Sequence, residues 1–259
     1  MRRPPELAQV VALGLIQGAA ELLPVSSSAH VAAVPELLGW EIAGWDAARR
    51  KELEVALHTG AALALAPELL RRLPDARTLA LSLAPPVIVG GLFERAIEER
   101  LGGLVAGLLL GAAALAAADM AGGEAARGAD AARAGRRGGA LQPGLVLGLA
   151  QAAALIPGVS RSGATLAAAR ALGYSRADAS RLSFGVAGPV LVGATALKAW
   201  RGRGTADRAL LATGIAASFV GTRGAVKAFG LERGALWPFA AERVALAGAI
   251  LAVRYRRRP

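Results

Sequence analysis

Residues 157–165 have the sequence PGVSRSGAT, which combines the residue types that bind phosphate. The proline ends an apolar run, and the two glycines, Gly158 and Gly163, permit a tight backbone close to a ligand. Arg161 offers a planar fork of donors that matches phosphate oxygens, and the amides of a following helix would face the same anion. The residues expected to contact phosphate are Gly158, Ser160, Arg161, Ser162 and Thr165. A simple turn whose arginine reaches a lipid headgroup is the alternative interpretation.

A second polar group, near the N-terminus, could supply acid–base and nucleophilic chemistry. Gln17 and Glu21 are four residues apart, so they share one face of a helix. A carboxylate at membrane depth is costly without a partner, and Arg161 is the natural partner for Glu21. The three serines at 26–28 follow, and one of their hydroxyl groups could attack phosphorus. His30 comes next and could transfer a proton near neutral pH, with a plain turn residue as the alternative.

The other histidine, His58, lies four residues after Glu54 in an apolar segment. A helical pair at this spacing could bind a metal or move a proton, but a structural contact between helices is the expectation. The chain has no cysteine, which excludes disulfides, thiolate metal sites and a cysteine nucleophile.

The two polar groups lie in segments that are versions of each other. Residues 13–30 and 147–164 align without a gap and match at nine of eighteen positions. Gln17 is aligned with Gln151, and Ser26 with Ser160. Each segment has an apolar run, a proline and a Ser-rich loop. A duplicated broken helix in a hydrophobic chain indicates a site buried at membrane depth.

The composition favours a membrane protein over an Ala-rich soluble helical protein. The 259 residues are 54% hydrophobic and have a mean hydropathy of +0.45. Long apolar runs at 101–118, 141–156, 182–199 and 210–226 approach the ~20 residues that cross a bilayer. The net charge is +11, and the arginines lie between apolar runs, which fits anionic lipid headgroups better than nucleic acid. Basic residues are nearly equal on the two predicted sides, so charge does not predict the orientation.

We therefore predict an all-α polytopic membrane protein whose residues 1–259 form a single membrane domain. Two inverted-topology repeats, at about 6–121 and 140–254, flank a Gly/Ala/Arg loop at 122–139. Each repeat has a re-entrant helix–loop–helix and three transmembrane helices. Three crossings reverse the direction of the chain, so the two loops are expected to meet near the midplane. The predicted segments are half-helices at 7–23 and 141–156, loops at 24–30 and 157–165, a linker at 41–51, and spans at 54–70, 79–93, 101–118, 179–199, 210–226 and 237–253.

These motifs carry a family resemblance. Gln17-x-x-x-Glu21 followed by PVSSSAH at 24–30, together with PGxSRSxxT at 157–165, closely resembles the undecaprenyl-diphosphate phosphatase family, also known as bacitracin-resistance proteins. The similarity runs from about residue 6 to the last span. Gln17 stands where many members have Glu, which removes one carboxylate that could bind a metal or act as a base.

The resemblance implies a multi-pass enzyme of the bacterial plasma (inner) membrane. It would hydrolyse undecaprenyl diphosphate to undecaprenyl phosphate and inorganic phosphate, which recycles the lipid carrier of cell-wall synthesis. Implied catalytic residues are Glu21, Ser27, His30 and Arg161, and implied substrate-binding residues are Gln17, Ser26, Gly158, Ser160, Ser162 and Thr165. No residue is assigned to a metal, although a divalent cation, Mg²⁺ or Ca²⁺, stays open as a cofactor. The expected partners are the polyprenyl diphosphate lipid and the bilayer, without nucleic acid, and a homodimer is left open.

Other functions compete with this reading. An inverted-repeat transporter or flippase could use the same loops to bind a phosphorylated lipid, with Glu21 as a proton-coupling site. The other membrane lipid-phosphatase superfamily places a histidine after its SR-containing loop, and no histidine follows Arg161 here. A structural protein would not need a buried acid facing an arginine loop. For an enzyme, a phosphoseryl intermediate and direct attack by water both remain open.

Overall fold

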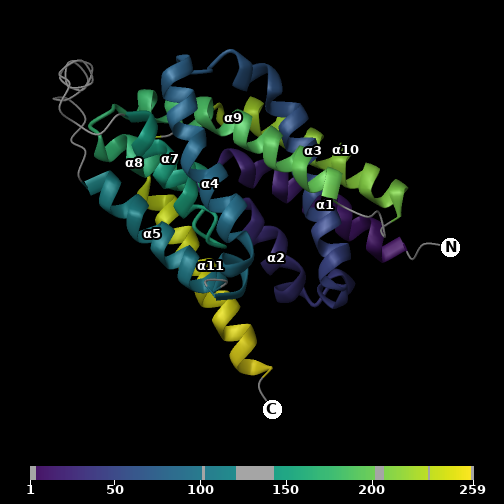
Figure 1. Ribbon diagram of the computed structural model, residues 1–259. Coiled ribbons are helices and arrows are strands. Elements are labelled where there is room, and N and C mark those ends of the chain that lie inside the picture. The colour runs from purple at the N-terminus through teal and green to yellow at the C-terminus, as the bar shows by residue number, and fades with distance from the viewer. Residues whose placement is uncertain (1–3, 101–102, 121–142, 202–206, 233, 258–259) are drawn as a thin grey trace.

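The computed structural model describes residues 4–100, 103–120, 143–201, 207–232 and 234–257. This part of the chain is helical and contains no strand (Figure 1). The loop predicted at 122–139 lies outside the described residues. The helices are α1 (Pro4–Leu22), α2 (Ser27–Leu38), the short 3-10 helix η1 (Glu41–Gly44), α3 (Ala47–Leu70), α4 (Ala76–Arg100), α5 (Leu104–Met120), α7 (Pro143–Ala153), α8 (Arg161–Ala171), α9 (Arg176–Arg201), α10 (Arg208–Phe229) and α11 (Trp237–Arg256).

The two broken helices predicted from the sequence are present, with shorter loops than expected. α1 and α2 are separated only by residues 23–26, and α8 begins at Arg161. Ser26 and Ser160 are the N-cap residues of α2 and α8, and the side chain of Ser160, unlike that of Ser26, caps its helix. Ser160 Oγ accepts a hydrogen bond from Gly163 N at 3.3 Å, which satisfies one amide of the first turn. Gly163 is therefore helical, and the prediction that it shapes a tight loop is wrong.

Two further boundaries differ from the sequence-based expectation. α3 begins at Ala47, inside the predicted linker, because the carboxylate of Asp46 caps it by accepting from Arg49 N at 2.8 Å. α7 ends at Ala153 rather than at 156. The amides of Leu155 and Ile156 instead make turn hydrogen bonds three residues back, which prepare the chain for Pro157.

Several helices have the length and composition of membrane spans. Three described segments qualify: Ala47–Leu70, Ala76–Phe93 and Arg208–Phe229. Leu104–Met120 and Pro143–Ala153 are apolar but shorter. α11, which was predicted as a span, does not meet the same measure, because Glu242, Arg243 and Arg254 interrupt its apolar run. The span predicted at 179–199 in α9 extends into residues whose side chains lie outside the described part of the chain. The fold class is nevertheless that of a polytopic, all-helical membrane protein.

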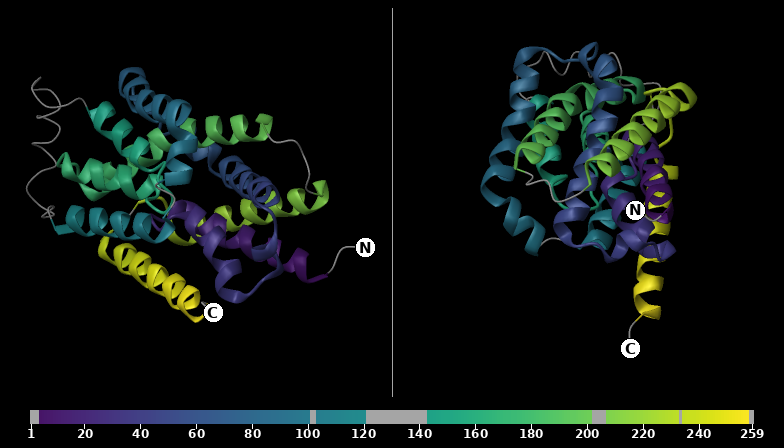
Figure 2. Two further views of the ribbon diagram at one scale, coloured as in Figure 1. Left: turned by 60° about the horizontal axis from the view of Figure 1, so that its bottom comes forward. Right: turned by 90° about the vertical axis from the view of Figure 1, so that its right-hand side faces the viewer.

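Each broken helix packs on a helix from the other half of the chain. α1 lies against α10, and α7 lies against α4; α11 runs alongside α5 (Figures 1 and 2). Glycines at matching positions of the duplicated segments permit both close approaches. A Cβ on Gly14 would lie 2.6 Å from the Cβ of Ala217, and one on Gly148 would lie 2.6 Å from the carbonyl oxygen of Leu81. Small residues thus let these helix backbones meet, as they do inside membranes.

Ion pairs connect helix ends that are distant in the sequence. Arg49 at the start of α3 lies 3.6 Å from Glu6 at the start of α1. Arg176 at the start of α9 lies 3.0 Å from Asp119 at the end of α5. Arg254 near the end of α11 lies 3.0 Å from Glu36 near the end of α2. Each of these contacts joins the ends of two helices, and the three contacts do not all lie on the same side of the bundle.

Candidate active site

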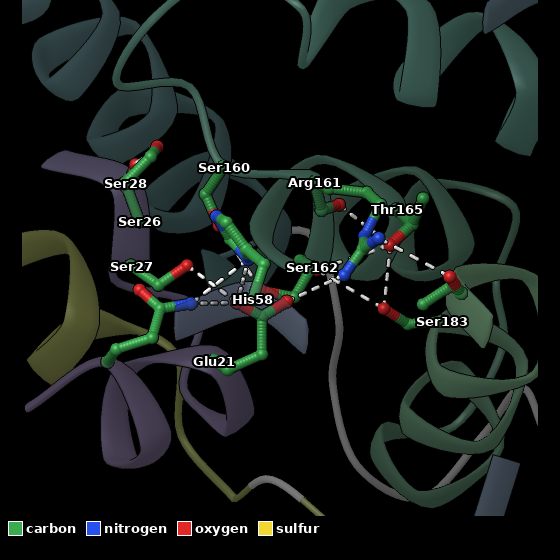
Figure 3. Close-up of polar contacts among 12 residues, drawn as sticks. Glu21, Ser26, Ser27, Ser28, His58, Ser160, Arg161, Ser162, Thr165 and Ser183 are labelled. Atoms are coloured by element: carbon green, nitrogen blue, oxygen red, sulfur yellow. Dashed lines mark hydrogen bonds and ion pairs between the residues drawn. The ribbon is translucent and has the colours of Figure 1, made fainter. Parts of the chain in front are cut away.

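Glu21 stands at the centre of the site, at the end of α1. Its side chain is 5% exposed, and both oxygens have partners. Oε1 accepts from Arg161 Nη2 at 2.8 Å, while Oε2 accepts from Ser27 Oγ at 2.8 Å and from Gln17 Nε2 at 2.8 Å. Figure 3 shows Ser27 and Arg161 on opposite sides of the Glu21 carboxylate. The predicted pairing of Glu21 with Arg161, across 140 positions of sequence, is confirmed.

The two loops share an unusual backbone conformation. Ser26 has φ 70° and Ser160 has φ 68°, and these are the positive-φ residues other than glycine in the described part of the chain. An L-residue with a side chain rarely adopts this region, so both turns are strained. The two serines occupy aligned positions of the duplicated segments. The backbone reverses abruptly at each serine, and the next residue, Ser27 or Arg161, then reaches the carboxylate of Glu21.

Arg243 of α11 fastens the two loops to each other. Its side chain is fully buried. Nε and Nη2 donate to the carbonyl oxygen of Pro24 at 2.8 and 2.6 Å, and Nη1 donates to the carbonyl oxygens of Gly158 at 3.2 Å and Val159 at 2.9 Å. One guanidinium therefore satisfies carbonyl groups of both breaks, where the helices leave backbone acceptors unpaired. A Cβ on Gly163 would lie 2.6 Å from Nη2, so this glycine makes room for the arginine.

The reacting groups line one cavity of about 400 Å³. Glu21, Ser27 and Arg161 reach it from both broken helices. Its polar lining consists of Glu21, Ser26, Ser27, Ser28, Lys51, Glu54, His58, Ser160, Arg161 and Ser162. Gly158 contributes backbone to the same wall. A carboxylate, a guanidinium and several hydroxyl groups around one space form a site that can bind a phosphate group and activate a hydroxyl nucleophile.

Two predicted site residues lie behind this cavity rather than in it. Gln17 is fully buried and reaches the site through Glu21. Thr165 is also fully buried, and its hydroxyl lies 2.6 Å from Ser183 Oγ and donates to the carbonyl oxygen of Arg161. Both therefore hold residues that line the cavity.

His30 faces α11, away from Glu21. Its Nδ1 lies 2.9 Å from the carbonyl oxygen of Ser26, and its Nε2 lies 3.0 Å from Glu242 Oε1. No contact between this ring and Glu21 is present among the described residues, and a part for His30 in proton transfer stays a prediction. His30 instead holds the strained turn at Ser26.

Sequence reasoning missed two residues that the structure places at the site. His58 Nδ1 lies 3.2 Å from Glu21 Oε2, although the sequence favoured a structural contact for this residue. Arg243 was not singled out. The residue type could have identified Arg243 in the sequence, because an arginine within an apolar helix at membrane depth requires a partner.

A divalent cation such as Mg²⁺ or Ca²⁺ needs several oxygen ligands around one point. Among the described residues, no group of three or more His, Asp or Glu side chains could hold a metal ion. Both oxygens of Glu21 already accept from Arg161, Ser27 and Gln17. The residues present do not fit Mg²⁺ or Ca²⁺ held by side chains alone.

The fold and the site define a class: a polytopic membrane protein with a Glu–Arg–Ser centre at the meeting point of two broken helices. The model of the family "Bacitracin resistance protein BacA" matches residues 10–249, and the chain belongs to this family. An undecaprenyl-diphosphatase of Pelotomaculum thermopropionicum is 38% identical over 210 residues, which are 73% of this chain and 74% of the relative. One of Alcanivorax borkumensis is 41% identical over 211 residues, which are 73% and 75% of the two chains.

Proposed function

We propose that this protein is a membrane phosphatase that hydrolyses undecaprenyl diphosphate to undecaprenyl phosphate and inorganic phosphate. The observation that carries the proposal is the 2.8 Å contact between Glu21 and Arg161 inside a cavity that Ser27 also lines. The relatives that bear the name undecaprenyl-diphosphatase share this family. The polyprenyl chain would stay in the bilayer, so only the diphosphate has to enter the site.

In the proposed mechanism, Arg161 binds the terminal phosphate and stabilises the charge of the transition state. Ser27 Oγ attacks phosphorus while its proton moves to Glu21 Oε2, to which the hydroxyl already donates at 2.8 Å. The Oγ–P bond forms, the bridging P–O bond breaks, and undecaprenyl phosphate leaves with the electron pair. Water then hydrolyses the phosphoserine and releases phosphate. The serines at 26, 160 and 162 would contact the phosphate oxygens.

We assign His30 a positioning role, since its ring contacts the Ser26 carbonyl and Glu242 rather than the carboxylate of Glu21. Ser26 directly precedes Ser27, so His30 would fix the direction in which the nucleophile points.

We further propose that the domain consists of two inverted repeats, at about 6–121 and 140–254, in the bacterial inner membrane. The support is threefold. The segments at 13–30 and 147–164 are duplicated, Ser26 and Ser160 share the same strained backbone, and each broken helix packs on a helix of the other half. A homodimer, left open by the sequence, is compatible with this arrangement.

Release of phosphate from a polyprenyl diphosphate by the purified protein in detergent tests the activity. A transporter needs two compartments and hydrolyses nothing, so detergent separates the two functions. We expect release by the wild-type protein, with and without a chelator, and loss of release in Glu21→Gln. Absence of release by the folded wild-type protein would reject the proposal.

The nucleophile can be identified with substrate labelled in its terminal phosphate. Rapid acid quenching should trap label on Ser27, and Ser27→Ala should neither trap label nor release phosphate. Turnover by Ser27→Ala at the wild-type rate would favour direct attack by water.

A further inference from the structure

His58 lies between two carboxylates and has no role in the mechanism above. Its Nδ1 is 3.2 Å from Glu21 Oε2 and 3.0 Å from Gln17 Nε2. Its Nε2 is 3.9 Å from Glu54 Oε1, one turn earlier in α3. The side chain is 21% exposed and lines the active-site cavity. A Glu–His–Glu line therefore begins at the carboxylate that receives the serine proton (Figure 3 shows the Glu21 end).

Gln17 determines which nitrogen of His58 carries the proton. The amide nitrogen of Gln17 donates to Glu21 Oε2 at 2.8 Å and lies 3.0 Å from His58 Nδ1. An amide nitrogen has two hydrogens and accepts none, so Nδ1 of the neutral ring must be the acceptor. The ring proton then lies on Nε2, which faces Glu54. His58 thus presents a basic lone pair beside the carboxylate oxygen that Ser27 contacts.

We propose that His58 removes the serine proton from Glu21 and passes it toward Glu54. The inference rests on the proposed phosphatase activity and adds a route for its proton. After Ser27 has given its proton to Glu21 Oε2, His58 Nδ1 accepts that proton. The imidazolium releases its Nε2 proton through one intervening water to Glu54 Oε1, 3.9 Å away, and exchange with water then returns the ring to the Nε2–H tautomer. Glu21 is again a carboxylate and is ready to act as the base for the water that hydrolyses the phosphoserine.

Glu54 lies where the proton can leave the site. It lines the active-site cavity and also a second cavity of about 530 Å³, and Ser28, Ala32 and Lys51 line both as well. Lys51 Nζ is 3.2 Å from Glu54 Oε2. The two cavities therefore adjoin at Glu54, so a proton that reaches Glu54 can enter the larger cavity.

Among the described residues, few charged groups face the His58 ring. They are Glu21 of α1, Glu54 of its own helix and, across Glu21, Arg161 of α8. On the other helices packed against α3, Arg223 of α10 faces Ala64 and Glu68, and Arg181 of α9 pairs with Asp178 and Glu232. An imidazolium formed at His58 would thus lie between two carboxylates.

The test compares His58→Gln with the wild-type protein. Glutamine can keep hydrogen bonds to Gln17 and Glu21 but cannot accept a proton. We expect kcat to fall about 10-fold or more, KM to stay within about twofold, and the dependence of kcat on pH around neutrality to flatten. Imidazole in the buffer should restore turnover to His58→Ala. The matched control is Thr59→Ala in the same helix, whose hydroxyl donates to the carbonyl oxygen of Val55 and should leave kcat unchanged.

Glu54→Gln is the second variant, at a more exposed position. It should lower kcat by about threefold or more, in a way that higher buffer concentration reverses. Unchanged kcat and pH profile in both His58→Gln and Glu54→Gln, with an active wild-type protein, would overturn the relay and leave the phosphatase intact. An inactive wild-type protein would instead reject the activity itself.

Discussion

At the scale of single residues, the site depends on a buried charge pair that is shared between two distant loops. Glu21 and Arg161 are 5% and 20% exposed, so each needs the other in an environment where an unpaired charge is costly. The pair also fixes geometry. Arg161 Nη2 contacts Glu21, and Nη1 donates to the carbonyl oxygen of Ala187 at 3.3 Å, so the guanidinium plane is held at two points.

This geometry predicts that charge alone does not replace Arg161. Arg161→Lys keeps the positive charge but loses the planar fork, so we expect kcat/KM to fall at least ~100-fold, about 2.7 kcal/mol. Phosphate release by the purified variant measures the loss. Near wild-type turnover would show that Arg161 does not bind the reacting phosphate.

At the scale of helices, close approach of backbones positions the broken helices. α1 and α7 meet α10 and α4 where Gly14 and Gly148 have no side chain. Inside a membrane the packing of small residues replaces the hydrophobic drive that would assemble these helices in water. The proposed catalytic residues Glu21, at the end of α1, and Arg161, at the start of α8, therefore depend on glycines more than one turn away.

Alanine at either glycine should separate the paired helices. We expect Gly14→Ala and Gly148→Ala each to lower the free energy of unfolding by about 1–3 kcal/mol, measured as a lower Tm in detergent. Gly248→Ala in α11 is the control, because a Cβ there meets nothing within 4 Å. It should leave Tm unchanged or raise it. Equal effects at all three positions would contradict the packing argument.

The hydrogen bonds from Arg243 of α11 to both loops give a second prediction at the scale of helices. Arg243→Met fills similar volume but leaves the carbonyl groups of both breaks without a donor, at about 1–3 kcal/mol for each buried acceptor. We expect a lower Tm together with reduced phosphate release, because both loops lose their anchor. Arg254→Met in the same helix removes the exposed pair with Glu36 and should change stability by at most ~1 kcal/mol. A fully active Arg243→Met would show that the two loops keep their conformation without the guanidinium of Arg243.

At the scale of the whole molecule, the path of the chain decides which faces of the membrane the loops reach. The ion pairs Arg49–Glu6 and Arg254–Glu36 join helix ends at one side, while Arg176–Asp119 and Arg181–Glu232 join ends at the other. Ion pairs between segments far apart in the sequence therefore connect helix ends at both sides of the bundle.

The proposed topology can be tested with single cysteines, because the chain contains none. We expect a membrane-impermeant maleimide to label Gly44→Cys and Arg208→Cys from one side, and Arg77→Cys and Glu232→Cys from the other. All four positions are exposed in the structure. Labelling of Arg208→Cys from the same side as Arg77→Cys would contradict the inverted arrangement.

The sequence by itself determined which two loops form the candidate site and the places where the helices break. Prolines, serine caps and the duplicated pattern act locally, so the breaks near Pro24 and Pro157 and the meeting of Glu21 with Arg161 could be predicted. The tertiary structure alone decided the rest. It turned His30 toward Glu242, brought His58 to the Glu21 carboxylate and placed Arg243 across both loops. These contacts depend on how helices far apart in the chain rotate and pack, and neither spacing nor composition encodes that rotation.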